Sequence, residues 1–192
     1  MSIAKRVAEA FKKISVGDHE GALMQVCAAI EATATAEYGK EGRSSYKTFL
    51  QENLGLITKV AFGASILNLN LGYTHPRVKT ATPGLCSFGD ILYHAVRCGL
   101  YHQASLPSDL RFHNEPSFVV EGGLLVLPAR LILGLVVAVI VAPVNKDKTV
   151  ADDHEGGLEI SGYKIPLKRL WGRRTELLNL YQAMDAIQKD HP

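Results

Sequence analysis

The chain has 192 residues, which suits a single domain with a sizeable hydrophobic core. Hydrophobic residues make up 47% and charged residues 21%, and the formal net charge of +2 argues against a protein that binds nucleic acid through overall charge alone. Three widely spaced cysteines without a Cys-x2-Cys pair suggest neither a zinc site nor a disulfide framework, so we expect reduced thiols and a cytoplasmic location.

The chain opens with two predicted helices. Residues 1–14 place apolar side chains at helical spacing with basic residues opposite, which predicts an amphipathic helix. Such a helix could lie on a membrane, but it more often packs on a core or a partner subunit, and we expect packing and no membrane association. Asp18 can cap a second helix, and Gly39 can end it because glycine readily adopts left-handed backbone angles.

Two further helices and a loop are predicted before the middle of the chain. Residues 43–53 resemble a helix, and residues 54–71 predict a short helix followed by a loop. Residues 72–84 contain two prolines and predict a surface loop. Residues 86–103 then predict the helix that we call the motif helix.

The second half of the chain carries the signals for strands. Phe118 to Glu121 and Leu124 to Leu127 are separated by two glycines and predict a β-hairpin. Pro128 can begin a buried helix whose uninterrupted apolar stretch, residues 131–142, would reach only about 18 Å. Because a bilayer core is roughly 30 Å thick, a central helix is favoured over a membrane span.

The last third predicts a connector, a hairpin and a helix. Residues 145–157 include the run Asp152 to Glu155, which resembles metal ligands but is better interpreted as a solvated loop, since adjacent residues on an extended chain point to opposite sides. Residues 158–165 predict a second small hairpin, and residues 166–189 a final helix with one basic side. The whole is expected to be mainly α, a helical bundle with one or two small β-hairpins in its C-terminal half.

Polar residues gather on one side of the motif helix. At about 100° per residue, Phe88, Ile91 and Leu92 begin a broad apolar arc. The opposite arc carries Asp90, Tyr93, His94, Arg97 and Tyr101. A solvated helix face would explain this set, but a guanidinium suits phosphate oxygens and tyrosines can stack on bases, so the face could also bind an anion.

His102 does not follow this pattern. It comes five residues after Arg97, about 140° around a regular helix, and would fall on the apolar arc. The helix could loosen near Gly99, His102 could end the helix, or His102 could be a buried histidine bonded to a backbone carbonyl. The sequence alone leaves these alternatives open.

The segment from Leu92 to Gln103, LYHAVRCGLYHQ, resembles the HEPN superfamily, whose members share a helical bundle and an Arg-x4–6-His motif. The motif corresponds to Arg97 and His102, and the likeness extends loosely over the preceding helices. It implies a single HEPN-like domain over residues 1–192, with a core at 1–109 and a hairpin and helix extension at 110–192. The position after the arginine is often polar in nuclease members, whereas here it is Cys98.

The resemblance also implies an activity. Active members are similar to metal-independent endoribonucleases, in which the histidine acts on the 2′-hydroxyl and the arginine stabilises the phosphate, usually across a homodimer interface. Arg97 and His102 are then the expected catalytic pair, Tyr93, His94 and Tyr101 the substrate-binding residues, and Asp90 a supporting residue, with no metal and no cofactor. Two alternatives stay open: a non-catalytic HEPN-like binding or assembly module for a nucleotide or a protein, and a purely structural role for the pair.

Overall fold

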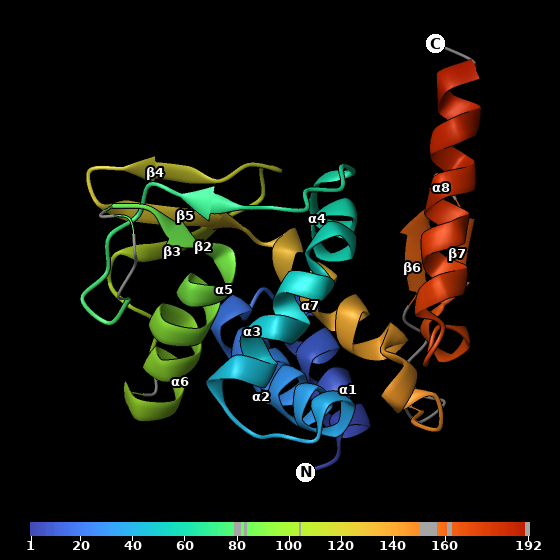
Figure 1. Ribbon diagram of the computed structural model, residues 1–192, viewed down its shortest axis with the longest axis horizontal. Coiled ribbons are helices and arrows are strands. Elements are labelled where there is room, and N and C mark those ends of the chain that lie inside the picture. The colour runs from blue at the N-terminus through green and yellow to red at the C-terminus, as the bar shows by residue number, and fades with distance from the viewer. Residues whose placement is uncertain (79–81, 83, 104, 150–156, 161–162, 191–192) are drawn as a thin grey trace.

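The computed structural model describes residues 1–78, 82, 84–103, 105–149, 157–160 and 163–190. Its secondary structure is mainly helical, with small strand pairs, as the sequence predicts. Helices gather in the lower and central part of the view in Figure 1, and most of the strands lie along the upper left. Among the described residues, we find no helix with both the length and the apolar character that a bilayer crossing requires.

Four helices form the N-terminal part of the fold. They are α1 (Ile3–Ser15), α2 (His19–Tyr38), α3 (Arg43–Glu52) and α4 (Leu54–Phe62). Asp18 caps α2 by accepting a hydrogen bond from the backbone of Gly21, and Gly39 ends α2 in the left-handed conformation, both as predicted. The apolar side of α1 packs on α2, so the first helix belongs to the core of the domain.

The centre of the fold is α7 (Arg130–Val141), the predicted buried helix. Ten of its twelve residues are buried, and it packs against α4 and α2, which Figure 1 shows around it. At Gly134 the helix passes so close to the carbonyl oxygen of Ile57 that a side chain would collide with it. An apolar helix of this length therefore serves as the core element around which the other helices pack.

A three-stranded sheet precedes α7. The predicted hairpin is confirmed as β4 (Val119–Glu121) paired antiparallel with β5 (Leu124–Pro128), and both turn glycines have positive φ. A third strand, β3 (Leu110–His113), pairs parallel with β5. The sequence predicts only a polar loop where β3 lies, because a four-residue strand between two prolines carries too little periodic signal.

Two further strand pairs complete the described strands. Strand β1 (Asn70–Leu71) pairs antiparallel with β2 (Cys86–Ser87). The predicted surface loop therefore connects two paired strands. The prediction that the motif helix begins at Cys86 is therefore wrong, because Cys86 lies in a strand ladder. The predicted second hairpin is confirmed as β6 (Gly157–Ile160) paired with β7 (Tyr163–Pro166).

The final helix begins later than predicted. A short 3₁₀ turn (η3, Leu167–Arg169) comes first, and α8 (Arg174–Asp190) follows. Gly172 separates them with a φ of 72° and lies directly against Lys146, where a side chain would collide. Figure 1 shows α8 rising beside β6 and β7 at the edge of the molecule. The connector between η2 (Pro143–Asn145) and β6 includes the acidic run 152–155, which lies outside the described residues.

Candidate functional site

The motif helix is assembled from three differently wound segments. They are α5 (Phe88–Asp90), the π-helical η1 (Ile91–Arg97) and α6 (Cys98–Gln103). Ser87 caps the first turn by accepting a hydrogen bond from the backbone of Asp90, and the backbone N–H of Cys98 bonds to the carbonyl of Tyr93, five residues back. A π turn is wider than an α turn, so a wheel drawn at a constant angle does not describe η1. Windings of this kind occur frequently at functional sites.

The predicted apolar arc of the motif helix is confirmed. Six of its apolar side chains are buried in the core: Phe88, Ile91, Leu92, Ala95, Val96 and Leu100. Cys98, by contrast, is partly exposed. The polar residues of the opposite arc are half-buried or exposed. They divide into two clusters with different neighbours, one around Arg97 and one around Asp90.

Arg97 lies in the first cluster, which we call the tyrosine cluster: Tyr93, Arg97, Tyr101 and Glu31. Its guanidinium carbon is 5.4 Å from the ring centre of Tyr93 and 4.8 Å from that of Tyr101. The Nη2 group of Arg97 donates to both carboxylate oxygens of Glu31 in α2, at 2.7 and 2.9 Å. The guanidinium is therefore clamped between two rings and compensated by a carboxylate of its own chain.

The electrostatics of Arg97 follow from these contacts. Burial lowers the pKa of the guanidinium, but the hydrogen bonds and the charge of Glu31 outweigh burial and raise it. Arg97 is consequently a permanent cation whose position is fixed. Its Nε is buried and has no hydrogen-bond partner among the described residues, so one donor of the guanidinium is not satisfied by Glu31.

His102 lies near the end of α6 with its side chain exposed. The alternative of a buried histidine in the core is therefore wrong, because His102 is exposed at the end of the helix. Among the contacts of the described residues, His102 has no hydrogen bond and no ion pair, and none joins it to Arg97. The two motif residues thus have separate surroundings within one chain.

Asp90 belongs to the second cluster, which we call the basic cluster: Arg43, Lys47, Asp90 and His94. Its carboxylate accepts hydrogen bonds from the Nζ of Lys47 at 2.7 Å, from the Oγ of Ser87 at 2.7 Å and from the Nη2 of Arg43 at 3.5 Å. Burial alone would raise the pKa of Asp90. The hydrogen bonds from Lys47 and Ser87 have the larger combined effect, so the pKa is lowered overall. The expectation that Asp90 supports the arginine of the motif is corrected, because its partners come from α3 and β2.

His94 is the histidine of the basic cluster. Its Nε2 lies 3.8 Å from the carboxylate of Asp90, too far for a hydrogen bond, and is buried without a partner among the described residues. The ring of Tyr93 meets its ring edge-on at 5.0 Å. Burial and the charges of Arg43 and Lys47 lower the pKa of His94, while Asp90 opposes them, so its imidazole is neutral near pH 7.

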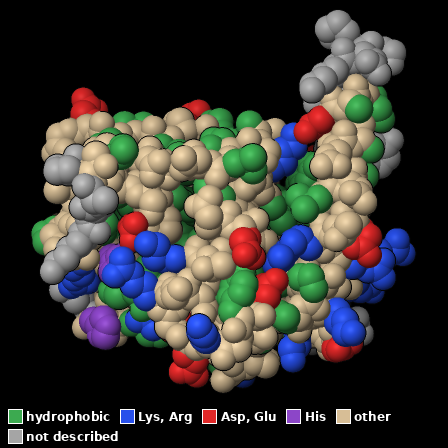
Figure 2. Space-filling view, viewed as in Figure 1, with side chains coloured by type: hydrophobic (Ala, Val, Ile, Leu, Met, Phe, Trp, Pro, Cys, Tyr) green, Lys and Arg blue, Asp and Glu red, His purple; other side chains and the backbone are tan. Residues whose placement is uncertain are grey.

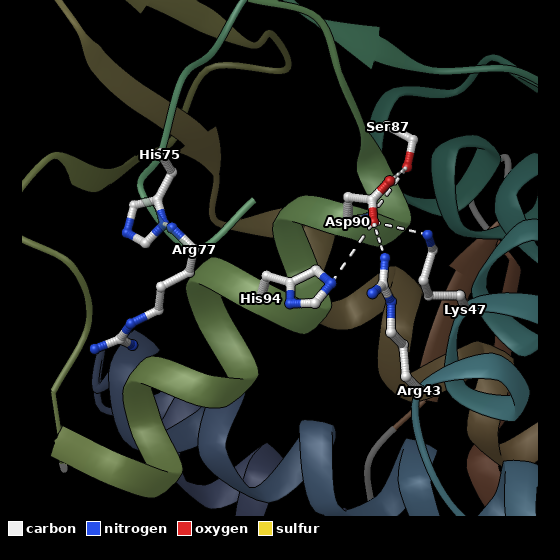
Figure 3. A network of polar contacts seen from close by, with 7 residues as sticks. All are labelled: Arg43, Lys47, His75, Arg77, Ser87, Asp90 and His94. Carbon is white, nitrogen blue, oxygen red and sulfur yellow. Dashed lines mark hydrogen bonds and ion pairs between the residues drawn. The ribbon is translucent and has the colours of Figure 1, made fainter. Parts of the chain in front are cut away.

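The loop before the motif helix adds two basic side chains near this face. His75 is only 8% exposed, and its Nδ1 accepts a hydrogen bond from the backbone of Arg77 at 3.2 Å. The Nη1 of Arg77 is buried beside Gly99 of α6 and has no partner among the described residues. Figure 3 shows His94 between Arg77 and His75 on one side and Asp90 with its cationic partners on the other.

A separate hollow of about 440 Å³ lies at the start of α2, against the loop and strand that follow the motif helix. None of the residues predicted to form the site lines it. Its wall carries both acidic and basic side chains, with Glu20 bonded to the backbone of Leu106. In the part of the chain that the structure describes, no group of three or more histidine, cysteine or acidic side chains is placed to hold a metal ion.

Sequence reasoning found the residues of the motif helix but missed their partners. Glu31 precedes Arg97 by 66 positions, and Lys47 precedes Asp90 by 43. Both partners lie on helices that were predicted, at positions where an exposed charge is unremarkable. The spacing of residues along one helix does not indicate which charged residue of another helix will contact them.

Comparisons with known proteins give one match. A family model described as Rv1289 matches residues 2–190, nearly the whole chain. No curated protein matches the chain. No solved structure matches it either.

Proposed function

The chain belongs to the Rv1289 family, and from the side chains of its motif helix we propose that it is a HEPN-like endoribonuclease that acts as a homodimer. Arg97 would hold the scissile phosphate and His102 would transfer the proton. The observation that carries the proposal is the presence of a fixed guanidinium and an exposed imidazole on the same helix. Arg97 is held by Glu31 and two tyrosine rings, while His102 is exposed to solvent.

A fixed arginine suits this chemistry. Stabilising charge that develops on phosphoryl oxygens works best when the donor is already in place, because no reorganisation is then needed during the reaction. Glu31 and the rings of Tyr93 and Tyr101 supply this fixation. The Nε of Arg97 remains a donor without a partner among the described residues.

The bond changes of the reaction are simple. His102 would accept the proton of a ribose 2′-hydroxyl, the 2′ oxygen would attack phosphorus, and the bond from phosphorus to the 5′ oxygen would break. The leaving oxygen would take a proton from a protonated imidazole or from water, and the other product would carry a 2′,3′-cyclic phosphate. Tyr101, with an exposed fraction of 44%, offers a ring on which a base could stack.

The proposal requires two subunits. Within one chain, Arg97 points to Glu31 and His102 points to solvent, so they do not share a pocket. A two-fold axis near α6 would bring the His102 of one subunit to the Arg97 of the other and would generate two equivalent sites. Each site would then combine one residue from each chain.

The ion pair between Arg97 and Glu31 favours a second candidate, a non-catalytic module that binds a nucleotide or a protein. A compensated guanidinium has lost much of its attraction for a phosphate, and its first role could be to join α2 to the motif helix. In that case Arg97→Ala would lower stability or alter oligomer size, and RNA would stay intact.

The two candidates separate in a cleavage assay. A mixed RNA pool is incubated with the purified chain in the presence of a chelator, and wild type is compared with Arg97→Ala, His102→Ala and the control His113→Ala. The endoribonuclease proposal expects cleavage by wild type and by the control, loss in both motif variants, and unchanged melting for His102→Ala because that side chain is exposed. Intact RNA with wild type, or equal cleavage by His102→Ala, would contradict it.

A further inference from the structure

The basic cluster has more positive than negative charge. Arg43 and Lys47 stand one turn apart on α3, and both face the single carboxylate of Asp90. Lys47 and Ser87 already satisfy that carboxylate at 2.7 Å, whereas the contact from Arg43 is long at 3.5 Å and the Arg43 side chain is 53% exposed. Arg43 therefore keeps most of its donors free for another acceptor.

Two buried side-chain nitrogens near the motif helix have no hydrogen-bond partner in the part of the chain that the structure describes. The Nε2 of His94 and the Nη1 of Arg77 are both buried without a hydrogen-bond partner among the described residues. A buried polar nitrogen without a partner is unfavourable, so its presence suggests that a ligand atom can pair with it. The buried nitrogen of His94 next to the two cations of α3 indicates a surface suited to an anion that offers several acceptor oxygens.

The surrounding surface agrees with this interpretation. Figure 2 shows lysine and arginine side chains, with histidines beside them, gathered on the side of the molecule that carries α5 and α6. Figure 3 shows the side chains of Arg43 and Lys47 approaching Asp90 from one side, with His94 reaching the same carboxylate from the other. Donors from α3, from η1 and from the loop before the motif helix thus lie around one helix face.

We propose that this face binds a phosphate group, held by Arg43, Lys47 and His94. Arginine offers a planar fork that matches phosphate oxygens, and lysine adds a compact charge. Arg77 would contribute from the edge of the site. Phosphate binding here does not require the motif to cut RNA, because the basic cluster and the tyrosine cluster share no residue.

The same charges make binding depend on pH. The groups that face His94 are Arg43 and Lys47 of α3 and Asp90 of its own helix, with the Tyr93 ring packed beside it. An anion seated among them would offset the two cations and raise the pKa of His94 from its lowered value. Binding of a phosphodiester, whose own charge does not change near neutral pH, should therefore take up a proton and become tighter as the pH falls from neutrality.

Calorimetric titration tests the site with inorganic phosphate alone, at constant ionic strength. Wild type is compared with Arg43→Gln and Lys47→Gln, and the exposed Lys12 supplies a control, Lys12→Gln, that removes one charge elsewhere. We expect saturable binding that is roughly tenfold weaker in each cluster variant and unchanged in the control. Because Arg43 is exposed, its variant should melt like wild type and report on binding alone.

A second titration, with a dinucleoside monophosphate, identifies the source of the phosphate. If the dinucleotide binds more tightly than inorganic phosphate, the ligand is a nucleic-acid backbone, and if inorganic phosphate binds at least as tightly, the ligand is a free phosphate or a monoester. The proposal is overturned if neither probe binds saturably to wild type, or if Arg43→Gln and Lys12→Gln lose affinity equally. Cleavage of RNA by Arg97 and His102 is measured separately, so either idea can fail without the other.

Discussion

The tyrosine cluster and the basic cluster lie on one helix and use the same kinds of side chain, yet their charges are balanced differently. In the tyrosine cluster one guanidinium meets one carboxylate, and both are more than two-thirds buried. In the basic cluster two cations share one carboxylate, and the outer cation is half exposed. The first arrangement fixes a side chain, and the second leaves positive charge for a ligand.

The largest effect should follow from breaking the balanced pair. Glu31→Gln leaves the charge of Arg97 uncompensated and partly buried, so the free energy of unfolding should fall by about 2 kcal/mol. Urea denaturation measures the change, and Glu41→Gln, at an exposed glutamate, serves as the control. A loss no greater than that of the control would show that the two clusters do not differ in the way described.

A smaller loss of stability, together with tighter phosphate binding, is expected on substitution of Asp90. Asp90→Asn removes a carboxylate that accepts from Lys47, and stability should fall by about 1 kcal/mol. The same change frees two cations, so inorganic phosphate should bind severalfold more tightly. Weaker phosphate binding by a folded Asp90→Asn chain would contradict the idea that the carboxylate competes with the ligand.

The pH dependence of the free energy of unfolding tests the electrostatics of the basic cluster. Because burial and neighbouring cations lower the pKa of His94, the folded chain binds fewer protons than the unfolded chain as the pH falls below about 6.5. Acid should therefore reduce the free energy of unfolding, and His94→Gln should make that reduction smaller. Denaturation in phosphate-free buffer at about pH 7.5 and about pH 5.5 measures it.

His75 provides an internal comparison for that experiment. Burial also lowers its pKa, with Asp109 opposing and Arg77 assisting, so His75→Gln should act in the same direction. If wild type, His94→Gln and His75→Gln lose the same free energy of unfolding between the two pH values, these histidines are not the source of the acid sensitivity.

The smallest effect on stability should come from Arg43. Its contact with Asp90 is long and its side chain is half exposed, so Arg43→Gln should change the free energy of unfolding by no more than about 0.5 kcal/mol. Thermal and urea denaturation check this. A much larger loss would mean that Arg43 is a structural partner of Asp90 and not a free ligand for an anion.

Local patterns were sufficient for much of the fold. The cap at Asp18, the stop at Gly39, the glycine turn between β4 and β5 and the apolar run of α7 each depend on neighbouring residues, and each was predicted. Strand β3 and the pairing of β1 with β2 were missed, because two to four residues become strands only through a distant partner. Gly172 was missed as a helix break because its constraint is the approach of Lys146.

The candidate site shows the same limit. The sequence placed Arg97, Tyr93 and Tyr101 together, since helical spacing alone brings them to one side. It assigned Asp90 to the wrong partner, because a π-helical segment and a lysine from α3 decide where that carboxylate points. The outward position of His102 was one of several alternatives that periodicity could not separate.

Subunit complementation tests the proposed composite site most directly. Arg97→Ala and His102→Ala are each inactive in the proposal, but a dimer with one subunit of each kind keeps one intact site that joins Arg97 of the second to His102 of the first. If half the dimers in an equal mixture are mixed and each has one of two sites, about a quarter of wild-type RNA cleavage should return. A mixture that stays as inactive as its parents, beside an active wild type, would contradict a site shared between subunits.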